Sequence, residues 1–491
     1  MNVPIIDPRQ YESLGRDFNG FGESSQEIVA DLNKALSAGY ATDPASQSAG
    51  GALRVESLDA TLKIVSFMMK HIRLYNDVPK SKAYNTVEEY NLLSKYGGRG
   101  SYFISEGGLP RTEDSTYQRK VQFVKYMGTT REVTHPMLLV RPAHGNVVAL
   151  ETKNGSMWML QRMEEALFKA NSASVPLAFD GLDTQLKAGY ADADTAGDGI
   201  ADTSAVHVLD LRGDPLTEAV FEEAAKVLLD NYMFPTHMYL PNQAHSDFNK
   251  MFFSKGRYNI PVGQDMAVGF NTEAVKTSGG AVQLRPDVFL RTDQQPPTTA
   301  DNSSAPTAPA SATVAVQAKS TSRGFKTAEF GTYAYKVTAI SQSGESAPTA
   351  GSGNAVVAAL GASDEVKITI GRGAQSGNDL TTGYRIYRTR LEDGAPGTTW
   401  YFVTEIASSG ASTIYLDGNE FLPGLGTAYM GQMDETVLTL RELSPMLKFP
   451  LATIASSIRW MQLYYNTPII FRPRGWVIVK NIGRTGVPTL G

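Results

Sequence analysis

QQPPTTADNSSAPTAPAS, residues 294–311, decides how this chain is organised. The stretch carries prolines at 296, 297, 306 and 309 and almost no large apolar side chain, so neither a helix nor a central strand fits it. Short runs that alternate apolar and polar residues follow it and end near Gly431. The stretch therefore predicts a linker into a separate β module inserted in a larger fold.

The inserted module has the pattern of a small β sandwich. Turn signals such as Ser343-Gly344 and Asp417-Gly418 separate its strands, and alternating residues such as Tyr333 and Tyr335 bury one face. Many short strands in so few residues are typical of an immunoglobulin-like or fibronectin-type sandwich, which we place at 294–435. Because the chain has no cysteine, we expect its core to depend on aromatic side chains alone. The expected strands are 312–317, 331–340, 366–370, 383–390, 399–406 and 412–416.

The sequence after the module is too short to form its own core. Residues 449–480 are rich in aromatic residues, yet such a segment cannot bury a hydrophobic core by itself. We expect it to pack on the first 290 residues, so the parent fold is discontinuous in sequence.

Composition excludes several classes of function. The 491 residues are 42% hydrophobic and 19% charged with a net charge of −5, which is globular and lacks the basic footprint of a protein that grips nucleic acid. The absence of cysteine excludes disulfides, thiolate metal sites and cysteine catalysis. The N-terminus does not read as a signal peptide, and no run is apolar enough to span a membrane. We expect a soluble protein.

The parent fold reads as an arm, a hairpin and an α/β unit. The arm carries two expected helices, one with an apolar stripe from Ile28 to Leu36 and one from Leu58 to Ile72. A long polar segment follows, in which two strands are expected to turn near Gly128. The remaining expected elements are a helix at 154–171, a strand at 206–211, a helix at 216–232 capped by Asp214-Pro215, a strand at 236–240, and a helix capped by Ser246 that runs to Phe253.

A search for catalytic and metal motifs is negative. The chain has no phosphate loop, nucleophile elbow, zinc-protease motif or dinucleotide fingerprint, its six histidines are scattered, and we expect no cofactor. One Gly/Ala loop carries four acids with a spacing that departs from the EF-hand, so a solvated loop is preferred to a calcium site. We likewise prefer helix capping by Asp214 to an integrin-type Arg212-Gly213-Asp214 motif. The acids of the loop are Asp192, Asp194, Asp198 and Asp202.

Basic residues of the long polar segment are candidates for contacts with neighbouring subunits. An isolated two-stranded arm is marginal in water, so it is expected to lie on its own body or on another copy. A solvated polar loop is the equal alternative. The candidates are Lys95, Arg99, Arg111, Arg119, Lys120 and Arg131.

The order of these parts resembles the Hong Kong 97-type major capsid proteins of tailed bacteriophages. The segment 216–253, centred on Phe234-Pro235-Thr236-His237-Met238-Tyr239-Leu240-Pro241, is similar to that family's A-domain, and Trp476-Val477-Ile478-Val479-Lys480 resembles its closing strand. The resemblance implies an α+β fold with an inserted all-β sandwich. Its parts would be an N-terminal arm at 1–76, the E-loop hairpin and adjoining P-domain strands at 77–147, the spine helix and P-domain at 148–205, the A-domain at 206–293, the insertion at 294–435, and a return to the A- and P-domains at 436–491.

The resemblance implies a structural protein of the virion and no enzyme. It would self-assemble as hexamers and pentamers into an icosahedral shell around double-stranded DNA, with a separate scaffolding protein, a portal and decoration proteins as partners. Synthesis in the host cytoplasm and no membrane association would follow. Two alternatives remain open: a tail or fibre adhesin that binds carbohydrate through the sandwich, and a carbohydrate-active enzyme with an accessory sandwich.

Overall fold

The fold is described from a computed structural model of the chain. It describes residues 67–97, 103–140, 146–189, 207–253, 272–291, 293–318, 324–349, 354–357, 364–374, 380–453 and 455–484. All of these except Asn146 belong to one compact unit, which comprises Val65–Val140 and Val147–Gly491. The helix predicted around 28–36 lies outside the described residues, as does most of the one predicted at 58–72.

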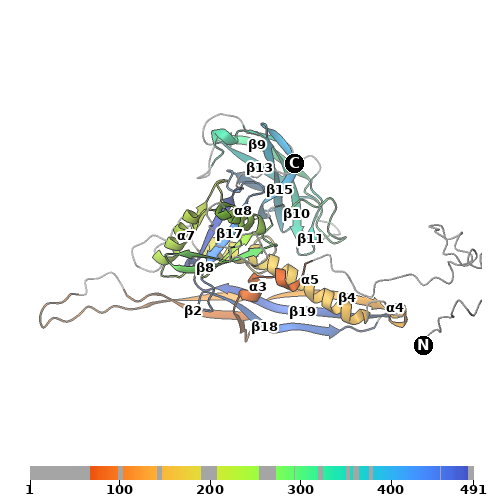
Figure 1. The fold of residues 1–491 in the computed structure, drawn as a ribbon. Helices are drawn as coiled ribbons and strands as arrows, with labels where there is room; N and C mark the ends of the chain where they lie inside the picture. Colours follow the sequence, from red (N-terminus) through yellow and green to blue (C-terminus); the bar gives the residue numbers. More distant parts are fainter. Residues whose placement is uncertain are drawn as a thin grey trace, which may run out of the picture. The chain divides into compact units, whose positions relative to one another are not determined.

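One sheet combines strands from both ends of the described chain. Its order is β1 (Lys80–Lys82), β18 (Leu438–Pro450), β19 (Ser457–Ile470) and β4 (Lys125–Thr134). Helix α5 (Val147–Lys169) lies along this sheet (Figure 1). The C-terminal segment thus packs back on the first part of the chain, and the predicted discontinuity is confirmed.

The two halves of α5 are held by different forces. Near its start, the Gln462 side chain donates hydrogen bonds to the Thr152 carbonyl at 2.8 Å and to Ser156 Oγ at 3.2 Å. Gly155 lies against the same Gln462 side chain, and a Cβ there would overlap its amide oxygen. Farther along, Met163 and Phe168 enter the main hydrophobic core. The first half is therefore held mainly by polar contacts, and the second half adds apolar burial.

The turn predicted at Gly128 is wrong. Strand β4 runs straight through this residue, which pairs with Leu463 of β19. A Cβ at position 128 would lie 2.6 Å from Leu463 Cδ2. The glycine permits a close approach between strands instead of a reversal of the chain.

The second sheet has six strands and includes the closing strand as predicted. Its order is β5 (Val208–Asp210), β20 (Trp476–Ile482), β17 (Gly426–Gly431), β6 (His237–Pro241), β8 (Gly280–Asp287) and β7 (Ala274–Thr277). Its helices are α7 (Glu218–Asp230) and α8 (Asn242–Phe253). Asp214-Pro215 does not cap α7, because the N-cap residue is Thr217, and α8 begins before Ser246. The helix-capping role preferred for Asp214 is therefore wrong.

The inserted module forms two sheets around a common apolar core. One has the order β11-β10-β14-β15 with β12 on β10, and the other has the order β16-β13-β9. All six predicted strands are present. β17 pairs with β6 and β20 of the six-stranded sheet, so the sandwich ends before Gly426 and not near residue 431 or 435. The strands are β9 (Ser311–Ala318), β10 (Gly331–Ser341), β11 (Gly344–Glu345), β12 (Asn354–Val357), β13 (Asp364–Gly371), β14 (Gly383–Glu392), β15 (Ala395–Ala407) and β16 (Ser412–Asp417).

The sandwich core contains a buried ion pair, so the expectation of aromatic packing alone is wrong. Arg388 is fully buried and donates from Nη1 to Asp417 Oδ2 at 2.5 Å. The Tyr335 hydroxyl donates to the same oxygen at 2.9 Å, and Asn419 Oδ1 accepts from Arg388 Nη2 at 2.5 Å. This network ties β10, β14 and the end of β16 together, in a module that has no disulfide.

The proline-rich stretch is packed on the sandwich. Asp301 accepts from the Glu345 backbone N–H at 2.9 Å, and the Ala310 N–H donates to the Gly371 carbonyl at 3.0 Å. Ala305 is buried. The predicted tether is therefore part of the module's surface.

Candidate assembly surfaces

One face of the two-stranded hairpin is open and exposes apolar side chains on both sides of the Arg119–Glu89 ion pair. Strands β2 (Val87–Lys95) and β3 (Thr116–Phe123) form a sheet by themselves, and directly opposite residues share a face. On one face Leu93 lies opposite Tyr117, and Val121 and Phe123 follow along β3. All four side chains are exposed, Tyr117 to 70%. We call these four residues the open hairpin face.

The opposite face is partly covered by its own chain. Tyr90 packs edge-on against Phe471 with ring centroids 5.0 Å apart, and burial raises the pKa of its phenol. Gln118, Lys120 and Gln122 on this face are half-buried. The hairpin thus has an inner face that packs on the body of its own chain and an outer face whose side chains are more exposed.

The described parts of the loop that joins β2 and β3 also expose apolar side chains. Leu109 is 94% exposed and Tyr96 is 88% exposed, and Phe103 and Ile104 are also exposed. Exposed apolar clusters of this kind mark interaction sites in soluble proteins. The segment predicted as polar therefore also exposes apolar side chains, which are interleaved with charged ones.

The predicted basic residues lie at several different places. Arg119 forms an ion pair with Glu89 across the hairpin, and Arg111 lies 3.6 Å from Glu113. Arg131 belongs to β4 and approaches Glu151 of α5 at 3.6 Å, away from the hairpin strands. Lys120 is on the half-buried face and has no ion pair within the described chain. The Lys95 side chain and the whole of Arg99 lie outside the described residues.

A buried acid joins the N-terminal part of the described chain to α5. Glu164 accepts the backbone N–H groups of Arg73, Leu74 and Tyr75 at 2.8, 2.6 and 2.8 Å, at the start of α3 (Leu74–Asp77). Burial and the neighbouring Asp287 carboxylate raise the pKa of Glu164 to about 9, so the side chain is protonated at neutral pH. Burial also raises the pKa of Asp287.

The same region contains a second polar link. The Tyr239 hydroxyl of β6 donates to Asp77 Oδ2 at 3.0 Å, and Arg285 Nε of β8 lies 3.4 Å from the same oxygen. The short helix α3 is therefore bound to both α5 and the six-stranded sheet.

Metal and membrane sites receive little support from the described residues. Asp192, Asp194, Asp198 and Asp202 lie outside them, and within them no group of three or more His, Asp and Glu side chains could hold a metal ion. None of the described helices is both long and apolar enough to cross a membrane.

The described chain is an α+β body with a hairpin whose outer face exposes apolar side chains, and such exposed side chains mark surfaces that bind other proteins. No protein-family model matches the sequence. The chain is 26% identical over 470 residues to a putative major capsid protein of Enterococcus phage phiEF24C, which covers 93% of this chain and 95% of that protein. It is 24% identical over 472 residues to the major capsid protein of Staphylococcus phage K, covering 93% and 96%.

Similar solved structures include one titled as a capsid and one from a phage. The capsid of a native GTA particle covers 90% of this chain and 99% of that one, at 9% identity and a TM-score of 0.46. A structure from Microbacterium phage Oxtober96 covers 89% and 99%, at 8% identity and a TM-score of 0.44.

The chain is a homologue of bacteriophage major capsid proteins and a structural capsid protein of the virion, not an enzyme. The predicted α+β fold is confirmed, and the described elements follow the order expected for the Hong Kong 97 type. These homologues support the capsid prediction over the adhesin and carbohydrate-active alternatives. The immunoglobulin-like nature of the inserted module stays a prediction.

Proposed function

We propose that this chain builds a closed icosahedral head shell of hexamers and pentamers, in which the open hairpin face covers a neighbouring copy. The observation that carries the proposal is the set of exposed apolar side chains on one face of a ribbon whose other face already meets its own body. Burial of each such side chain is worth about 1.5–3 kcal/mol. Closed symmetry repeats this contact around the shell.

The parts of the chain are proposed to take the following roles. β2 and β3 form the E-loop, α5 is the spine helix on the P-domain sheet β1-β18-β19-β4, and the sheet from β5 to β7 is the A-domain. The segment before residue 77 is the N-terminal arm.

We propose that the inserted module is an immunoglobulin-like domain on the outer surface of the shell. Its β12-β10-β14-β15 order matches a C′-C-F-G sheet, and β9 paired with β13 matches strands B and E. It departs from that fold in its last strand, because β16 takes the place of a strand that comes earlier in the sequence. The buried Arg388–Asp417 pair occupies a core that has no disulfide.

The other proposed partners are the DNA that the shell would enclose and the proteins that would assemble with it. With a net charge of −5, the chain would enclose double-stranded DNA without sequence-specific binding. A scaffolding protein, a portal and decoration proteins are proposed as separate chains, and synthesis is proposed to take place in the host cytoplasm.

A double substitution on the open hairpin face tests the proposal. Tyr117→Ser with Val121→Ser should leave the circular dichroism of the subunit unchanged and abolish particle formation with the scaffold supplied, as seen by electron microscopy and sedimentation. Ile414→Ser, at a comparably exposed apolar side chain of β16, is the matched control and should assemble normally. Particles of the double variant at wild-type yield would show that this face makes no essential contact.

A further inference from the structure

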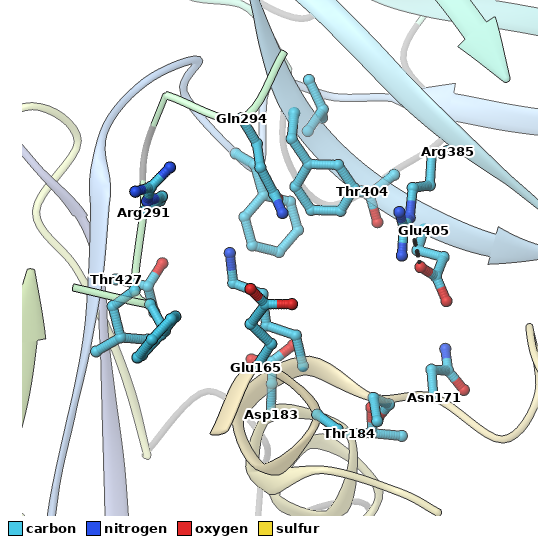
Figure 2. A pocket seen from close by; sticks show the side chains of 18 of the residues that line it. Glu165, Asn171, Asp183, Thr184, Arg291, Gln294, Arg385, Thr404, Glu405 and Thr427 are labelled. Atoms are coloured by element: carbon cyan, nitrogen blue, oxygen red, sulfur yellow. Dashed lines mark hydrogen bonds and ion pairs between the residues drawn. The ribbon is translucent and has the colours of Figure 1, made fainter. Parts of the chain in front are cut away.

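A cavity lies where the sandwich meets α5 and α6 (Leu182–Gly189). Its volume is about 560 Å³, within the range of small-molecule sites. Its walls come from α5, α6, the segment 289–294, strands β14 and β15, and the segment 421–429. Figure 2 shows side chains from these elements, including Glu165, Gln294 and Glu405, around one common space.

The walls of the cavity have a surplus of positive charge. Five basic and three acidic side chains line it. Each acid already has a basic partner within the cavity: Arg162 lies 2.9 Å from Glu165, Lys187 lies 2.6 Å from Asp183, and Arg385 lies 2.9 Å from Glu405. The other two basic side chains that line the cavity are Lys169 and Arg291, and neither has an ion pair within the described chain.

The surroundings of Lys169 disfavour its charge. Its side chain keeps contact with solvent, yet the enclosing protein lowers its pKa, which Asp183 partly opposes and Arg385 reinforces. Its Nζ lies 5.6 Å from the centre of the Phe402 ring. A negatively charged group in the cavity would favour the charged form of Lys169 and so oppose the effect of desolvation.

We propose that the cavity binds a small dianion, phosphate or a phosphate monoester, between Lys169 and Arg291. Two unpaired cations match two negative charges, and a guanidinium can bind phosphate through two parallel hydrogen bonds. Neutral donors such as Gln294 and Thr404 line the same space. Because the walls come from both the sandwich and the body, a bound dianion would strengthen the attachment of the inserted module.

Calorimetric titration of the purified full chain tests the site. Inorganic phosphate at pH 7.5 should give saturable 1:1 binding, and deoxyadenosine should give none. Deoxyadenosine monophosphate distinguishes the two sources of the group, since binding about tenfold tighter than phosphate indicates an ester and equal binding indicates the free ion.

Variants decide whether the named cations are responsible. Lys169→Gln and Arg291→Gln should each weaken phosphate binding by about tenfold or more, because each removes a hydrogen bond to a charged group. Lys169→Arg should retain binding, and Arg119→Gln, an exposed cation on the hairpin, should not change it. The absence of saturable binding, or equal binding by all variants, would overturn the proposal. Neither result bears on shell assembly, which the hairpin variants test separately.

Discussion

The β2–β3 hairpin and the inserted sandwich place their side chains in opposite ways. The hairpin exposes Tyr117, Val121 and Phe123, whereas the sandwich buries the ion pair of Arg388 and Asp417. A buried charge is unfavourable without an opposite charge, and exposed apolar side chains are unfavourable without an apolar surface to cover them. In the sandwich, the partner of each buried charge lies in the same core. In the hairpin, the proposed partner of the exposed apolar side chains is another copy of the chain. Substitutions in the sandwich should therefore change the stability of the subunit, and substitutions on the hairpin should change assembly.

The largest effect is expected in the sandwich core. Asp417→Ala leaves the Arg388 charge buried without its carboxylate, and we expect a loss of about 3–5 kcal/mol in the free energy of unfolding. Denaturant titration of the purified subunit measures it. The double variant Arg388→Met with Asp417→Leu should recover most of the loss, because no unpaired charge remains. A loss below about 1 kcal/mol in Asp417→Ala would show that the sandwich does not depend on this pair.

An intermediate effect is expected at Glu164, a buried acid outside both regions. Its pKa is raised from 4.5 to about 9, so between these values the folded state holds a proton that the unfolded state has lost. The stability from this group is fully present below pH 4.5 and falls as the pH rises toward 9. At pH 5 we expect Glu164→Gln to be less stable by about 1–3 kcal/mol, because the amide nitrogen cannot accept the Tyr75 N–H.

Unfolding midpoints at pH 5, 7 and 9 measure this effect. Relative to wild type, the Gln variant should lose less stability as the pH rises, so the gap between the two proteins should narrow. Parallel pH profiles would mean that the Glu164 carboxyl does not titrate in this range.

The smallest effect is expected at the exposed ion pair of the hairpin. Arg119 and Glu89 are both largely in solvent, and such pairs contribute about 0.2–1 kcal/mol. Arg119→Gln should therefore leave the thermal unfolding of the subunit nearly unchanged. A loss above about 1 kcal/mol would mean that the hairpin is stabilised within the subunit, and the contrast with the sandwich would weaken.

The strands of the sandwich could be predicted from sequence because local patterns determine them. Alternating side chains such as Tyr333, Tyr335 and Val337 have buried partners within the same module. The end of the module could not be predicted, since the sequence of β17 resembles that of the sandwich strands. Only its pairing with β6 and β20 distinguishes it from them. The turn predicted at Gly128 is wrong for a related reason. In sequence, a glycine that permits the close approach of two strands cannot be distinguished from a glycine in a turn.

The basic residues predicted as intersubunit contacts stay a prediction, and the structure adds exposed apolar side chains in the same segment. The sequence predicts an arm that is marginal by itself and offers its basic residues as contacts. Of these, Arg119 and Arg131 have acidic neighbours in their own chain. The signal available in sequence was the period-two spacing of Tyr117, Val121 and Phe123, which places these three side chains on one face together with Arg119.

The way the sandwich joins the six-stranded sheet has a mechanical consequence. The chain leaves the sheet after β8 and re-enters it through β17, and these two strands lie on either side of β6. A load applied to the module from outside would thus reach neighbouring positions in one hydrogen-bonded sheet. The force would be distributed over the hydrogen bonds that β6 makes with β17 on one side and with β8 on the other. The module can therefore transmit stress without concentrating it at one flexible hinge.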